Sequence, residues 1–105
     1  MKIRIRNKWH YKGAKWDSHN WDWEVFLDDN GSGELSNVDF VEYVLVPSFP
    51  HPIRKITDPK GGFLLKSSSF GTFTLLAFVY TKDGRKEKMV HNLMLGLNPI
   101  DGISD

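Results

Sequence analysis

The chain has 105 residues, of which 40% are hydrophobic, 13% aromatic and 26% charged, with a net charge of +1 and no cysteine. This length suits one domain that buries roughly two-thirds of its unfolded surface, and the aromatic content excludes a disordered chain. The lack of cysteine excludes disulfides, thiolate catalysis and cysteine zinc sites. The sequence has no apolar run of ~20 residues and no signal-peptide pattern at Met1–Arg6, so we expect a cytoplasmic protein without a membrane segment.

The charges nearly cancel but are unevenly distributed along the chain. Residues 1–15 hold six basic side chains and no acid, whereas residues 16–53 hold eight acids and no Lys or Arg. We expect the strands in these two stretches to pair and neutralise each other. The alternative is an acidic surface that attracts a basic ligand through its summed field. Alternating charges on one strand are typical of a solvated sheet edge, so nucleic acid is not expected as a partner.

Alternation of apolar and polar residues with a period of two predicts a series of strands and no helix. In chain order the expected strands are Ile3–Tyr11, Trp21–Leu27, Val38–Val46, Gly62–Lys66, Thr72–Thr81 and Lys86–Leu97, with an Asp-Gly hairpin turn at residues 82–85. This spacing predicts an all-β fold, an antiparallel β-sandwich of about seven to eight strands, as a single domain over residues 1–97. Residues 98–105 are expected to form a flexible C-terminal tail or linker.

Residues 28–39 resemble the calcium loop of an EF-hand in their spacing of oxygen-bearing side chains. Asp28, Asn30 and Ser32 fall at positions one, three and five, and Asp39 falls at position twelve. The short Asp side chain suits position twelve poorly, and both flanking segments have the pattern of strands rather than helices. An Asx-rich turn between two strands is therefore the favoured interpretation, and a calcium-binding loop is the alternative. No cofactor and no metal are expected.

The segment from Val41 to Pro52, V-E-Y-V-L-V-P-S-F-P-H-P, is a predicted strand that stops at a proline-rich loop. Ser48 and Phe49 lie between three prolines, which fix φ and remove backbone donors. A stiff loop that carries a serine and an aromatic ring is typical of a small recognition site, although a plain strand-ending turn has the same pattern.

The sequence predicts a protein that is not an enzyme. The four histidines lack the spacing of metal ligands on a strand or helix. Ser48 has neither a histidine–acid arrangement nor a strand–turn–helix elbow around it. Carboxylate pairs such as Asp22 and Glu24 share one face of a strand, where they are usually solvated.

The order of several motifs resembles the YEATS domain family, and its prokaryotic branch most of all. The resemblance rests on W-D-W-E-V-F-L at Trp21–Leu27, on the proline-rich segment Val41–Arg54, on Asp58-Pro59, and on F-G-T-F at Phe70–Phe73. It covers about residues 15–95, most of the chain. It implies an immunoglobulin-like sandwich, with residues 28–39 as a hairpin connection.

Eukaryotic YEATS domains are readers, so the resemblance implies a non-catalytic module that holds a peptide in an aromatic slot at the loop end of the sandwich. The implied ligand is an acetylated or crotonylated lysine. The implied binding residues are Ser48, Phe49, Phe70 and Gly71, supported by Phe73, together with His19 or Trp16 from the preceding loop. The readers have a histidine two residues before the serine, where this chain has Val46, and Tyr or Trp where it has Phe70.

A second functional hypothesis is an interaction or sensory domain of a bacterial signalling or defence system, with a vestigial pocket. This hypothesis expects a protein partner bound along an exposed sheet edge such as Ile3–Trp9. The oligomeric state is left open.

Overall fold

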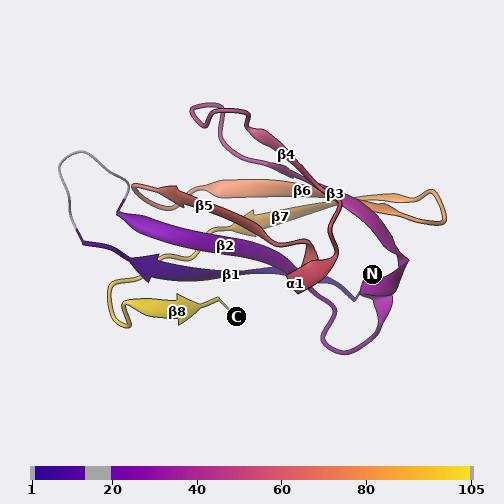
Figure 1. Cartoon of the computed structure of the whole chain (residues 1–105), viewed down its shortest axis with the longest axis horizontal. Coiled ribbons are helices and arrows are strands. Elements are labelled where there is room, and N and C mark those ends of the chain that lie inside the picture. Colours follow the sequence, from indigo (N-terminus) through magenta and orange to yellow (C-terminus); the bar gives the residue numbers. More distant parts are fainter. Residues whose placement is uncertain (1, 14–19, 105) are drawn as a thin grey trace.

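The computed structural model describes residues 2–13 and 20–104 and shows two four-stranded antiparallel sheets packed face to face (Figure 1). One sheet has the strand order β5-β2-β1-β8 and the other β4-β3-β6-β7. The strands are β1 (Arg4–Tyr11), β2 (Trp21–Asp28), β3 (Val38–Val44), β4 (Ile53–Ile56), β5 (Leu65–Ser69), β6 (Thr74–Thr81), β7 (Lys86–Asn92) and β8 (Asp101–Ile103). The predicted all-β, immunoglobulin-like sandwich is confirmed. The second hypothesis expected a free sheet edge at Ile3–Trp9. Among the described residues β8 pairs with β1 at Lys8–His10, so this edge is covered in part and not along its whole length.

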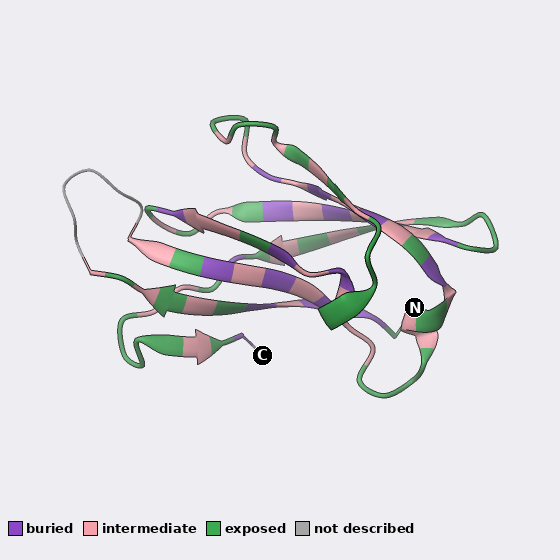
Figure 2. Ribbon diagram, viewed as in Figure 1, coloured by how far each residue is buried: buried purple, intermediate pink, exposed green. Residues whose placement is uncertain are grey.

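The hydrophobic core lies between the two sheets, and the strands contribute alternate residues to it. The fully buried side chains include Trp23, Val25 and Leu27 of β2 and Leu75, Ala77 and Val79 of β6. Their neighbours along each strand are half-buried or exposed, and Figure 2 shows this alternation. The core therefore has the period-two pattern from which the sandwich was predicted. The helical segments among the described residues lack the length and hydropathy of a membrane-spanning helix.

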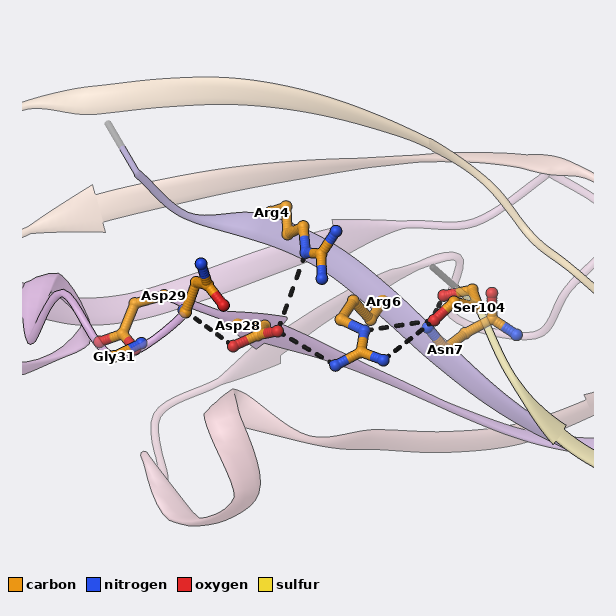
Figure 3. Close-up of polar contacts among 8 residues, drawn as sticks. Arg4, Arg6, Asn7, Asp28, Asp29, Gly31 and Ser104 are labelled. Atoms are coloured by element: carbon orange, nitrogen blue, oxygen red, sulfur yellow. Dashed lines mark hydrogen bonds and ion pairs between the residues drawn. The ribbon is translucent and has the colours of Figure 1, made fainter.

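The basic side chains of β1 lie against acidic side chains of β2, as the charge distribution predicted. Arg6 Nη1 lies 3.2 Å and Arg4 Nε 3.8 Å from Asp28 Oδ2 (Figure 3). At the other end of the same strand pair, Lys12 Nζ lies 3.0 Å from Asp22 Oδ1. Part of the uneven charge along the chain is therefore neutralised locally, at the two ends of this strand pair, whereas Glu24 in its middle lies 3.5 Å from Lys66 Nζ.

Residues 98–104 are not a loose tail, because part of this segment completes the first sheet. β8 pairs with β1, the Ser104 N–H donates to the Asn7 carbonyl at 2.7 Å, and the Asn7 N–H donates to Ser104 Oγ at 2.8 Å. The strand passes against the Trp9 ring, where a Cβ on Gly102 would lie 2.0 Å from Trp9 Cζ2. The expected flexible tail is therefore wrong for residues 101–104. A three-residue strand has no periodicity to detect, and its fit depends on a distant tryptophan.

A four-residue helical turn, α1 (Lys60–Phe63), takes the place of the start of the strand expected at Gly62–Lys66. It approaches β2 so closely that a Cβ on Gly62 would lie 2.2 Å from the Leu27 carbonyl oxygen. The Tyr43 hydroxyl donates to the Phe63 carbonyl at 2.8 Å, and burial raises the pKa of Tyr43, which keeps the phenol a donor. These contacts hold α1 against the sandwich, and β5 begins only at Leu65.

Candidate ligand-binding site

The proline-rich loop between β3 and β4 is held by backbone hydrogen bonds, which fix the position of Ser48 and Phe49. The Leu45 N–H donates to the Pro52 carbonyl at 2.8 Å, and the Phe49 N–H donates to the Val46 carbonyl at 3.0 Å. The Arg54 guanidinium also donates to the carbonyls of Pro50 and His51, at 2.8 and 2.6 Å. The loop therefore folds back on itself as a compact turn, as the prolines predicted.

A second loop, residues 70–73 between β5 and β6, lies at the same end of the sandwich. Trp23 Nε1 donates to the Ser69 hydroxyl at 3.1 Å, and this hydroxyl donates to the Gly71 carbonyl at 2.9 Å. The Leu93 N–H donates to the Phe73 carbonyl at 3.0 Å. One buried serine thus connects the core tryptophan to the turn that carries Phe70.

Three aromatic rings from different elements pack together at the site, and Phe49 and Phe73 line it while Trp23 is buried in the core. The centroids of Phe49 and Phe73 are 5.2 Å apart, and those of Trp23 and Phe73 are 5.8 Å apart in an edge-to-face arrangement. Trp23 and Phe49 are 6.4 Å apart, also edge to face. Such pairs stabilise beyond simple area burial. Phe70, which lines the same pocket, differs from these rings because it is 65% exposed.

The two loops enclose an open pocket of about 560 Å³. It is lined by Val46, Ser48, Phe49, Pro50, Ser69, Phe70, Gly71, Thr72 and Phe73. Five of the implied binding residues therefore meet in one cavity together with Val46, the position where the readers have histidine, whereas Trp16 and His19 lie outside the described residues. None of the described residues that line the pocket is ionisable.

Sequence reasoning missed Pro50, Ser69 and Thr72 as lining residues. The first and third flank predicted residues, so their neighbours in sequence were an available signal. Ser69 is the last of three consecutive serines, and the sequence offers no reason to separate it from the other two. Only the register of β5 on β2 places it against Trp23.

The two serine hydroxyls at the pocket differ in their hydrogen bonding. Ser69 is buried, and its hydroxyl both accepts and donates a bond. Ser48 is exposed, and its hydroxyl has no hydrogen-bond partner in the part of the chain that the structure describes. The first hydroxyl therefore supports the loop, and the second is available to a ligand.

The loop over residues 28–39 lacks the helix–loop–helix geometry of an EF-hand, since it begins at the end of β2, contains a 3-10 turn (Glu34–Asn37) and runs into β3. Asp28 accepts the Asn30 N–H at 2.9 Å and faces Arg6, and these contacts hold the pKa of Asp28 below its usual range. Within residues 2–13 and 20–104 no cluster of three or more His, Asp or Glu side chains is suited to a metal ion. The Asx-rich turn is the interpretation that this geometry supports, against the calcium-binding alternative with Asp28, Asn30, Ser32 and Asp39 as ligands.

Comparison with known proteins gives a family match and several structural neighbours. The family model for the prokaryotic YEATS domain matches residues 21–94. Among solved structures, the yeast AF-9 homolog protein Yaf9 superposes with a TM-score of 0.74 at 19% identity, covering 97% of this chain and 76% of that chain. No curated protein sequence matches.

Two further structures are YEATS domains of Yaf9 with peptides. One is bound to H3K27ac and has a TM-score of 0.74 at 21% identity, covering 97% of this chain and 78% of that chain. The other recognises an H3K122suc peptide and has a TM-score of 0.68 at 20% identity, covering 97% of this chain and 79% of that chain. At this level of identity the likeness shows a common fold.

Proposed function

The chain belongs to the prokaryotic YEATS domain family, and we propose that it is a non-catalytic binding module whose pocket holds a neutral acylated lysine of a peptide. The observation that carries this proposal is the meeting of Ser48, Phe49, Phe70, Gly71 and Phe73 around one cavity. These residues come from two loops that the sandwich places at the same end. YEATS domains of a yeast relative take acylated histone peptides, which supports an acyl-lysine as ligand at the level of the family.

The chemistry of the lining favours a neutral acyl-lysine over unmodified lysine. A buried ammonium is expensive unless an opposite charge pairs with it, and no described residue of the lining is ionisable. Acylation converts the ammonium to a flat amide with an apolar tail. The exposed Phe70 ring can cover one face of this amide and the Phe49 side of the pocket the other.

The amide of the ligand also needs hydrogen-bond partners, since buried polar groups left unpaired cost about 1–3 kcal/mol each. The Ser48 hydroxyl is accessible for this purpose. Val46 stands beside it on the same turn, with its carbonyl accepting the Phe49 N–H. The aliphatic Val46 side chain adds apolar surface where the eukaryotic readers have histidine, which favours an aliphatic acyl chain.

The same argument separates neutral acyl groups from acidic ones. Acetyl and crotonyl groups add only apolar atoms to the amide, whereas a succinyl group adds a carboxylate. The described lining offers no cation to pair with that carboxylate. We therefore expect acetyl- and crotonyl-lysine to bind more tightly than succinyl-lysine.

The test is an NMR titration of the ¹⁵N-labelled chain with four peptides that differ only at one lysine, which is acetylated, crotonylated, succinylated or unmodified. The expected result is a set of shift changes around Ser48 and Phe70 with the first two peptides. Phe70→Ala should remove binding without unfolding the domain, because this ring is 65% exposed. Phe26→Ala, which removes an outward ring on β2, is the matched control and should bind normally. Equal shifts with all four peptides, or no shifts with any at millimolar concentration, would contradict the proposal.

A further inference from the structure

A row of four aliphatic side chains crosses the outer face of the β4-β3-β6-β7 sheet. The strand register pairs Ile53 with Val44, Val44 with Leu76, and Leu76 with Val90, so each strand contributes one residue to the row. The two end members, Ile53 and Val90, are 60% and 62% exposed. With strands about 4.8 Å apart, this aliphatic row is about 14 Å long.

The two flanks of the aliphatic row differ in charge. On one flank, the next outward residues along the strands are Lys55, Glu42, Phe78 and Lys88, followed by Phe40, Tyr80 and Lys86. These positions, named here the lysine flank, hold three lysines and one glutamate. On the other flank, the register pairs Thr74 with Asn92, which are uncharged. The face therefore joins an apolar strip to a positive border on one side.

The aromatic rings of the lysine flank are already covered. Phe40 and Tyr80 stack with centroids 4.3 Å apart and planes 15° apart. Lys55 Nζ lies 4.4 Å from the Phe40 centroid, and Lys86 Nζ lies 4.7 Å from the Phe78 centroid. Stacking of unpaired nucleobases needs open ring faces, so this arrangement disfavours single-stranded nucleic acid as the occupant.

Charge also disfavours a second copy of the same chain on this face. Two copies packed through it would bring three lysines of each chain together against one Glu42 each, and opposed like charges are unfavourable at an interface. A surface that combines apolar and acidic groups is the complementary one.

We propose that this face docks an amphipathic helix of a partner protein, with apolar side chains on the aliphatic row and Asp or Glu side chains on the lysine flank. A helix of about 10 residues is about 15 Å long, which matches the row. The helix is about 10 Å wide, and the first lysines lie about 7 Å along the strands from the row, so one side of the helix lies above them. Contiguous exposed apolar surface of this kind marks interaction sites.

This docking surface is separate from the loop pocket, and binding at each is expected to affect different residues. Acyl-lysine binding involves the loops around Ser48 and Phe70, whereas helix docking involves the outward residues of β3, β4, β6 and β7. In the described part of the chain, the residues that line the pocket and those of the docking surface do not overlap. The domain can therefore hold a ligand in the pocket while bound to a partner through the sheet.

The test uses the full chain and a synthetic capped peptide of about 14 residues with leucines on one helical face and glutamates along one flank. Titration followed by NMR should shift the amides of Ile53, Leu76 and Val90. The double variant Ile53→Ser/Val90→Ser should lower the affinity for the peptide at least about tenfold, as truncation of central apolar anchors does. Lys55→Glu/Lys88→Glu should lower the affinity by a similar factor. Added salt should reduce the difference in affinity between that variant and the parent.

The matched controls are Ile100→Ser and Lys60→Glu, which change exposed residues away from this face and should leave the affinity unchanged. A peptide with lysines in place of the glutamates should not bind. Four results would overturn the proposal: equal binding of the lysine peptide, peptide shifts confined to the Phe70 loop, displacement of the peptide by a thymidine oligonucleotide, or self-association of the chain that the Ile53→Ser/Val90→Ser variant abolishes.

Discussion

The Ser69 hydroxyl bonds both to Trp23 in the core and to the turn at Gly71 beside the candidate pocket, and Ser69→Ala removes it. The Trp23 ring is 2% exposed and its Nε1–H donates to this hydroxyl at 3.1 Å. In the variant the indole N–H has no acceptor, and a buried donor left unpaired costs about 1–3 kcal/mol. The Gly71 carbonyl also loses its donor at 2.9 Å, but Gly71 is only half-buried, so water can replace that bond.

The expected cost of Ser69→Ala is therefore about 2 kcal/mol, nearly all of it from Trp23. For a domain of this size each kcal/mol lowers Tm by about 4–8 °C, so the midpoint should fall by roughly 10 °C. Urea unfolding with an unchanged m-value would confirm that the loss is one of stability. We also expect weaker binding of the acetyl-lysine peptide, because the hydroxyl holds the turn at Gly71 that presents Phe70.

The matched control is Ser67→Ala on the same strand, whose hydroxyl makes no hydrogen bond within the described residues and whose removal should change stability by less than about 0.5 kcal/mol. A double-mutant cycle with Trp23→Phe isolates the Trp23–Ser69 bond, and its coupling energy should be about 2 kcal/mol, because nearly all of the cost of Ser69→Ala comes from Trp23. If Ser69→Ala unfolds at the same temperature as Ser67→Ala, or if the coupling energy is zero, the reasoning is refuted.

Three other outcomes follow from the buried and charged groups. Burial lowers the pKa of His91 below 6.5, so the unfolded chain takes up the proton more readily than the folded chain. Stability should therefore be lost as the pH falls below about 6.5. His91→Gln should flatten a plot of Tm against pH in that range. Asn7→Leu should cost about 1–3 kcal/mol in urea unfolding, because the Asn7 side chain accepts the Met94 N–H at 3.0 Å and donates to the Met94 carbonyl at 2.7 Å from a fully buried position. Calcium should leave Tm where a chelator leaves it, since Asp28 is already occupied by Arg6 and the Asn30 N–H; a rise of several degrees with calcium would show instead that the loop over residues 28–39 binds the ion.

Much of the fold was predictable because a strand with one face in the core alternates apolar and polar residues along the sequence. β2 alternates Trp23, Val25 and Leu27 with polar or half-exposed neighbours, and the prediction Trp21–Leu27 differs from the observed strand by one residue. The proline-rich turn was equally readable, since proline acts on the backbone around it. For these elements the information is local, so neighbouring residues suffice.

The elements that sequence reasoning missed are those whose stability depends on distant residues. β4 is four residues long and includes Arg54 and Lys55, so it has no apolar alternation to detect. It forms because β3 offers it a partner in register. β8 likewise forms because Gly102 fits against Trp9, a contact between the two ends of the chain.

The sequence by itself determined that this chain is an all-β sandwich of the YEATS type, with Ser48 and Phe49 on a stiff loop and Phe70 on a second one. Only the tertiary structure decided that the two loops share a pocket, that Ser69 rather than its neighbours supports it, and that Ile53, Val44, Leu76 and Val90 stand in one row. The physical reason is that periodicity and turn chemistry act over a few residues, whereas register is set by pairing between strands. A shift of one residue would turn every side chain to the opposite face, so which side chains meet is a property of the folded sheets.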